Sequence, residues 1–293
     1  MWPFRRSHQA MGEAPAIVRV RGLQTTVKGP HDAWGRPGRP QPMLMSAEVA
    51  LQGAFAASSS QDALAVDTVH YGQLSKAIRA SVERLSLLSA LPEAEPLTTL
   101  FSNLALVWRD IRAGDNADVP SPDADIRLLD VGAVSYLLLT AFLPKASLLG
   151  DGVSLVMAGA VSGFAEEPTC ALGLHGLRVP TLIGINGNER RARQTVVISV
   201  EIDNFDPSAD NYHGIEARVV EETAASSFDT LEALAAHLLK IIARYLRAQR
   251  LEPGDGSGSR VTIIVEKPMA VPFADAPAVE LRLNTNDVLA RRR

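Results

Sequence analysis

Hydrophobic and polar positions follow the same succession of patterns in the two halves of this chain. In the second half, apolar or alternating runs at 170–179, 195–204, 261–265 and 279–283 predict four strands. Between the second and third of these runs, apolar residues recur at every third or fourth position. This spacing is typical of a helix with one buried face. That stripe consists of Leu231, Leu234, Ala235, Leu238, Leu239, Ile242 and Leu246. The predicted order is strand, strand, helix, helix, strand, strand.

The first half repeats this order. Strands are predicted at 17–22, 43–51, 134–142 and 153–158, and helices at 72–88 and 96–112. A loop at 114–125, rich in Asp, Pro and Ser, is longer than its counterpart in the second half. Antiparallel strands with both helices on one face predict an α+β fold built as a tandem repeat.

Domain boundaries follow from that repeat. We expect a tail at 1–14, a first domain at 15–164 and a second domain at 169–288, with the junction near 164–168. A chain of 293 residues agrees with two domains. The start of the long second-half helix is predicted at Asp229, as N-cap, with Glu232 completing a capping box.

Composition narrows the class of protein. Hydrophobic residues make up 46% and charged residues 21%, as in folded globular domains. The formal charge of −4 argues against a nucleic-acid partner, which favours a concentrated basic face. No apolar run is long enough to span a membrane, so no membrane partner is expected. A single cysteine, Cys170, excludes an internal disulfide and indicates a reducing compartment.

Localisation is therefore predicted to be cytoplasmic. The start of the chain, 1–7, carries arginine and lacks acidic residues, which leaves a mitochondrial address as an alternative. The six histidines show no paired ligand spacing on one element, so no metal site is predicted. The segment 254–258, rich in Gly and Ser, is interpreted as a turn rather than a phosphate-binding loop.

Two short strings and two spacings point to one chemistry. Glu266-Lys267-Pro268 closes an apolar strand, and Asp67-Thr68-Val69-His70-Tyr71-Gly72 lies far upstream. Gly176 precedes Glu189 by thirteen residues, and Tyr212 precedes Glu232 by twenty. Together these features resemble the dihydroneopterin aldolases of folate synthesis, over nearly all of both halves. The resemblance implies tunnelling-fold (T-fold) units, each with a four-stranded antiparallel sheet and two helices on one face.

The resemblance also implies roles for individual residues. Lys267 would be the catalytic base, Glu189 would orient the substrate's side-chain hydroxyls and support Lys267, and Tyr71 would reach the site from a first half. Glu232 would anchor the pterin ring, because a carboxylate can accept the ring's amide N–H and its exocyclic amine together. The resemblance assigns four further residues to the substrate pocket: Leu231, Gln194, Val69 and His70.

Each of the three charged candidates also has an ordinary structural interpretation. Glu232 can serve as a residue of the helix start. Lys267 can be a strand-end lysine that extends its ammonium to water. Glu189 can be a solvated loop carboxylate loosely paired with an arginine.

The first half departs from the pattern. Gly35 stands thirteen residues after Gly22, where a glutamate is expected, and Phe101 and Ser102 stand at the position of the ring anchor. Lys145 keeps the lysine position without either carboxylate. We therefore predict a degenerate second site made of Lys145 and Tyr212.

The resulting hypothesis is an aldehyde-lyase that cleaves 7,8-dihydroneopterin without a cofactor, a metal or a Schiff base, with epimerisation left open as a side reaction. Its small-molecule partner is a dihydropterin. Closing exposed sheet edges favours a homo-oligomer, either one ring of two chains or two such rings stacked to give four chains in all. The alternative is a non-catalytic tunnelling-fold protein that binds a pterin or acts as a scaffold.

Overall fold

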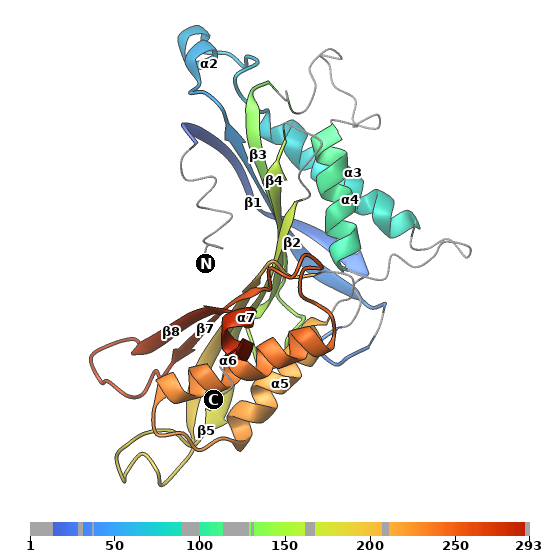
Figure 1. The fold of residues 1–293 in the computed structure, drawn as a ribbon. Coiled ribbons are helices and arrows are strands. Elements are labelled where there is room, and N and C mark those ends of the chain that lie inside the picture. Colours follow the sequence, from blue (N-terminus) through green and yellow to red (C-terminus); the bar gives the residue numbers. More distant parts are fainter. Residues whose placement is uncertain are drawn as a thin grey trace. The chain divides into compact units, whose positions relative to one another are not determined.

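The structure is a computed structural model, and it describes residues 14–28, 32–36, 38–88, 100–113, 129, 132–161, 168–206 and 211–290 (Figure 1). The chain divides into two compact units. The first contains the strands and helices up to Leu143, together with β4 from Leu155 onwards. The second contains the connection Pro144–Ser154 and the chain from Ala171. Of the described helices, none is long and apolar enough to cross a membrane.

The first unit carries strands in the order β1, β2, β3, β4. β1 pairs antiparallel with β2, and β2 pairs antiparallel with β3. Helix α3 packs on β1 and helix α4 packs on β3. The elements are β1 Ala16–Lys28, β2 Pro40–Leu51, α2 Ala56–Gln61, α3 Tyr71–Leu88, α4 Leu100–Ala113, β3 Val134–Leu143 and β4 Gly152–Ala160.

The second unit repeats this arrangement with strands in the order β5, β6, β7, β8, each pair antiparallel. Helix α6 packs on β7 and β8 and against α5. The elements are β5 Thr169–Thr181, β6 Gln194–Asp203, α5 Tyr212–Ala225, α6 Leu231–Ala248, β7 Arg260–Glu266, β8 Ala278–Asn284 and α7 Thr285–Ala290. The α+β class expected from the sequence is confirmed.

The first strand of each unit bends at a glycine. Gly22 in β1 has φ +64° and Gly176 in β5 has φ +61°, and the pairing register shifts at both places. The amide of Gly22 donates to Ser46 Oγ at 3.0 Å, and the amide of Gly176 donates to Ser199 Oγ at 3.1 Å. A left-handed backbone favours glycine, and an extra residue in one strand bends and twists it. Both units therefore curve the first strand by the same local device.

The predicted elements are present, with different bounds in places. β1 continues to Lys28, beyond the predicted end at residue 22, because the bulge at Gly22 redirects the strand without ending it. The short helices α2 and α7 were not predicted. The predicted helix at 96–112 is described from Leu100. Residues 1–13, 114–125 and 164–167, which include the predicted tail, long loop and junction, lie outside the described residues, so the predicted domain boundaries stay a prediction.

The apolar stripe of α6 is buried as predicted, with Leu231 as a half-buried exception. The predicted cap of this helix is wrong. Thr230 is the N-cap, with extended backbone, and its hydroxyl accepts the Ala233 N–H at 3.2 Å. Glu232 is therefore the second helical residue, one position too early to close a capping box. Asp229 instead forms an ion pair with Arg190.

Candidate functional site

The side chain of Lys267 is buried at the end of β7. Its backbone N–H donates to the Pro277 carbonyl at 3.0 Å, which carries the β7–β8 pairing one residue beyond the strand. The side chain is 7% exposed, its Nζ donates to the Ile183 carbonyl at 3.3 Å, and it forms an ion pair with Glu189 Oε1. The ammonium is therefore held at one place between β7 and the loop after β5.

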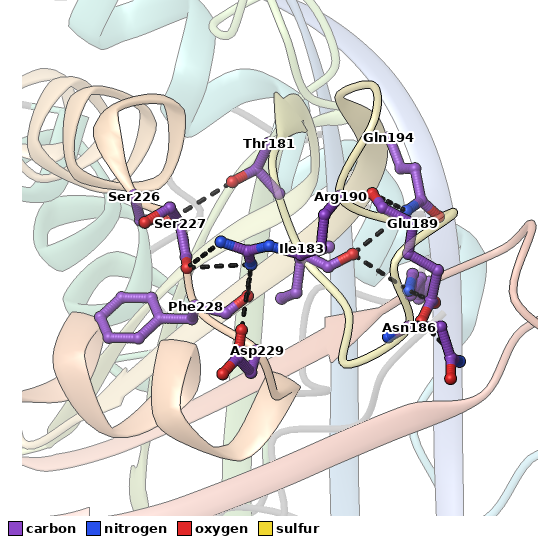
Figure 2. Close-up of polar contacts among 11 residues, drawn as sticks. Thr181, Ile183, Asn186, Glu189, Arg190, Gln194, Ser226, Ser227, Phe228 and Asp229 are labelled. Carbon is purple, nitrogen blue, oxygen red and sulfur yellow. Dashed lines mark hydrogen bonds and ion pairs between the residues drawn. The ribbon is translucent and has the colours of Figure 1, made fainter.

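Glu189 belongs to that loop, which joins β5 to β6. Its second carboxylate oxygen, Oε2, accepts the backbone N–H of Asn186 at 3.1 Å and the Asn186 side-chain amide at 2.9 Å (Figure 2). Gly184 has φ +136°, and a Cβ there would lie 2.5 Å from Glu189 Cδ, so the loop needs glycine at this position. One carboxylate oxygen therefore binds the lysine while the other is fixed by the loop.

Gln194 completes the support of this pair. Its Nε2 donates to the Ile183 carbonyl at 3.1 Å and to the Glu189 carbonyl at 3.2 Å. The Ile183 carbonyl thus accepts from both Gln194 and Lys267. The structure brings together three residues singled out in the sequence: Lys267, Glu189 and Gln194.

The surroundings of Glu189 favour its charged form. The hydrogen bond from Lys267 is the largest cause of the lowered pKa of Glu189, and the Asn186 backbone N–H contributes in the same direction. A carboxylate with these donors remains ionised at neutral pH. Glu189 is therefore a hydrogen-bond acceptor only, which suits it to hold hydroxyl groups and an ammonium.

The lowered pKa of Glu189 predicts a pH-dependent stability. Because the folded pKa lies below the ordinary value of 4.5, the contribution is complete above that value and is lost as the pH falls through the folded pKa. Urea unfolding of the wild type and of Glu189→Gln between pH 7 and pH 3 should show the wild type losing more stability on acidification. Parallel pH dependence of the two proteins would contradict this expectation.

Arg190, which the sequence analysis did not single out, connects the Glu189 loop to the start of α6. Its Nη1 donates to the carbonyls of Ser227 at 3.0 Å and Phe228 at 3.1 Å, and its Nη2 also donates to Ser227 at 3.0 Å (Figure 2). The guanidinium also pairs with Asp229 at 3.2 Å. The run Arg190-Arg191 was visible in the sequence, but its acceptors are backbone carbonyls, which leave no signal in a sequence.

The other substrate-pocket residues expected in the second unit lie at the start of α6. Glu232 is exposed in the first turn of the helix, and Leu231 is its half-buried first residue. Because Arg190 contacts Asp229, the loop that carries Glu189 is fastened three residues before Glu232. The role of Glu232 as the ring anchor stays a prediction.

Three predicted site residues lie in the first unit. Tyr71, the first residue of α3, is 66% exposed. Its neighbour His70 accepts the Gly72 N–H at 3.0 Å on Nδ1, which supports the helix start, and Val69 is buried. His70 therefore supports the start of helix α3, and the phenol of Tyr71 is exposed on its first residue.

The two residues of the expected degenerate site differ in exposure. Lys145 is exposed in the connection between β3 and β4, and Tyr212 is 2% exposed at the start of α5, with its ring 4.4 Å from that of His213. Within the described part of the chain, no group of three or more His, Cys, Asp or Glu side chains could hold a metal ion.

One family model matches most of the second unit. The family model described as dihydroneopterin aldolase matches residues 172–282. The matched residues include Glu189, Gln194, Glu232 and Lys267.

One curated relative extends the similarity beyond residues 172–282. The chain is 24% identical over 264 residues to a folic acid synthesis protein of Schizosaccharomyces pombe, covering 90% of this chain. The chain spans about 30% of the length of that relative. The first half therefore shares in the similarity, although the family model matches only the second.

Two solved structures match this chain, one over 39% of its length and the other over 95%. Escherichia coli dihydroneopterin aldolase, in complex with neopterin, is 22% identical, covering 39% of this chain and 98% of the enzyme at a TM-score of 0.30. A uricase from Bacillus fastidious is 11% identical, covering 95% of this chain and 96% of the uricase at a TM-score of 0.58. The second comparison shows that the chain shares its fold with a uricase over most of its length.

Proposed function

We propose that this protein is a dihydroneopterin aldolase of folate biosynthesis. The observation that carries the proposal is the buried Lys267 with its ion pair to Glu189, inside the residues that match the aldolase family. A strand-end lysine that serves solubility would extend its ammonium into water. Here the ammonium is turned inward against a carbonyl and a carboxylate.

The proposed reaction is a retro-aldol cleavage. Lys267, acting as its neutral amine and through an ordered water, takes the proton of the 2′-hydroxyl of 7,8-dihydroneopterin and becomes an ammonium, and the bond between C1′ and C2′ breaks. The electron pair of that bond passes into the ring's N5=C6 imine, so that an enamine forms and glycolaldehyde leaves. Protonation of the enamine at C1′ gives 6-hydroxymethyl-7,8-dihydropterin. Because the ring itself accepts the electrons, the reaction needs no lysine Schiff base and no metal.

Binding of the substrate divides between two groups. Glu232 is proposed to hold the pterin ring through its amide N–H and exocyclic amine, an arrangement strengthened by the charge of the carboxylate. Glu189, ionised and fixed by Asn186, is proposed to accept hydrogen bonds from the side-chain hydroxyls. The exposure of Glu232 supports this role, because a carboxylate that binds a ligand must be reachable.

Tyr71 is proposed to supply the phenol that protonates the enamine. Its exposure of 66% makes the hydroxyl available to a ligand or to another chain. We further propose that the chain consists of two tandem tunnelling-fold units that assemble into a homo-oligomeric ring. The matching bulges at Gly22 and Gly176 support the repeat.

The test is incubation of the purified protein with 7,8-dihydroneopterin. We expect glycolaldehyde and 6-hydroxymethyl-7,8-dihydropterin to appear in equal amounts, at a rate unchanged by EDTA, and borohydride to trap no protein adduct. Release of the 2′-epimer would reveal epimerisation. Binding of neopterin without any product would instead support the non-catalytic pterin binder, and loss of activity in EDTA would contradict the metal-free mechanism.

A further inference from the structure

The guanidinium of Arg190 joins two parts of the second unit that are far apart in sequence. It extends from the loop of Glu189 to three consecutive residues, Ser227, Phe228 and Asp229, which precede the N-cap of α6. The Arg190 side chain is 31% exposed, whereas that of Asp229 is 71% exposed. The ion pair with Asp229 is therefore weakened by solvent, and the bonds to the two carbonyls are the more constraining contacts.

Other anchors hold the base of the same loop. The Thr181 hydroxyl donates to the Thr223 carbonyl at 2.8 Å, and Arg193 donates to the carbonyls of Pro180 and Ala224. These contacts fasten the two ends of the loop to the end of α5. Arg190 is bonded covalently to Glu189 and acts nearer the middle of the loop, so it fixes the part that carries the carboxylate.

An arginine suits this role better than a lysine. Its planar guanidinium has five N–H donors in a fixed fork, and here the fork binds two carbonyls and a carboxylate at once. A lysine ammonium on a flexible stem would keep the charge near Asp229 without fixing the same geometry. The Arg190 contact therefore fixes the position of the Glu189 loop more than it sets the local charge.

We propose that Arg190 is a positioning residue that sets the distance between the ring anchor Glu232 and the hydroxyl-binding pair Glu189 and Lys267. The inference rests on the proposed function. Through this distance the site selects dihydropterins with a hydroxylated side chain, because such a ligand must satisfy Glu232 and Glu189 together. A pterin without a side chain engages the ring anchor alone and is insensitive to the distance.

The experiment compares two ligands on one variant. Dissociation constants of neopterin and of unsubstituted pterin are measured with the wild type, Arg190→Ala and Arg190→Lys. Arg190→Ala should reduce the preference for neopterin over pterin by about tenfold while changing pterin affinity by less than about twofold, because misplacing one of two binding groups affects only ligands that use both. Arg190→Lys should lose most of the same preference.

Arg191→Ala is the matched control, because it removes the same charge from the exposed neighbouring residue. It should keep the wild-type preference. Retained pterin binding also reports that each variant is folded, and if Arg190→Ala does not fold, Arg190→Lys carries the test. A wild type that prefers neopterin, with Arg190→Ala and Arg190→Lys keeping that preference, would overturn the role of Arg190. A wild type that binds neither ligand would instead overturn the proposed function.

Discussion

Replacement of Lys267 by alanine is expected to lower kcat for 7,8-dihydroneopterin by about 10²–10⁴-fold, the range that general acid–base groups contribute. The side chain is 7% exposed and is held by the Ile183 carbonyl and by Glu189, so nearby side chains or water cannot easily take its place. Stopped-flow or steady-state detection of glycolaldehyde measures the effect. A variant with near wild-type turnover would remove Lys267 from the mechanism.

Two controls separate chemistry from structure. Lys267→Arg keeps a positive charge beside Glu189, but a guanidinium stays protonated at neutral pH and cannot take up the substrate's proton. It should therefore remain folded and inactive. Lys145→Ala removes the exposed lysine of the expected degenerate site and should leave turnover within about twofold of the wild type, as expected of a surface change outside the site.

The fold could be predicted from the sequence where the pattern itself reports burial. The stripe of α6 and the apolar run of β7 each place hydrophobic residues on a buried face, and both elements begin and end close to the predicted residues. Helix α2 was missed because its six residues contain no buried residue and its start is fixed from outside. Asp67 accepts the N–H groups of Ala57 and Ser58, ten and nine residues earlier in the chain.

The site was less accessible to sequence reasoning. Lys267 and Glu189 are 78 residues apart, and spacing within one element cannot pair them, so their contact was expected through the family resemblance alone. The cap of α6 shows a related limit. Asp229 and Thr230 are both good N-cap residues, so the sequence does not distinguish them; in the structure Asp229 pairs with Arg190 and Thr230 caps the helix.

Removal of a single oxygen in Tyr71→Phe is expected to lower kcat by about 10²-fold, as for loss of one proton donor. Because Tyr71 is 66% exposed, the melting temperature should stay unchanged. Steady-state turnover together with thermal unfolding separates the two effects. Tyr212→Phe is the matched control, since it removes the same hydroxyl at the corresponding position of the second unit and should leave turnover nearly intact.

A mixing experiment asks which chain supplies the phenol. If Tyr71 completes a site on a neighbouring chain, oligomers reassembled from Tyr71→Phe and Lys267→Ala chains contain sites in which an intact Tyr71 meets an intact Lys267. Those hybrids should regain activity that neither variant has alone, because each chain repairs the defect of the other. Turnover that stays at the level of the separate variants, under conditions where chains are shown to exchange, would contradict a phenol supplied by a neighbouring chain.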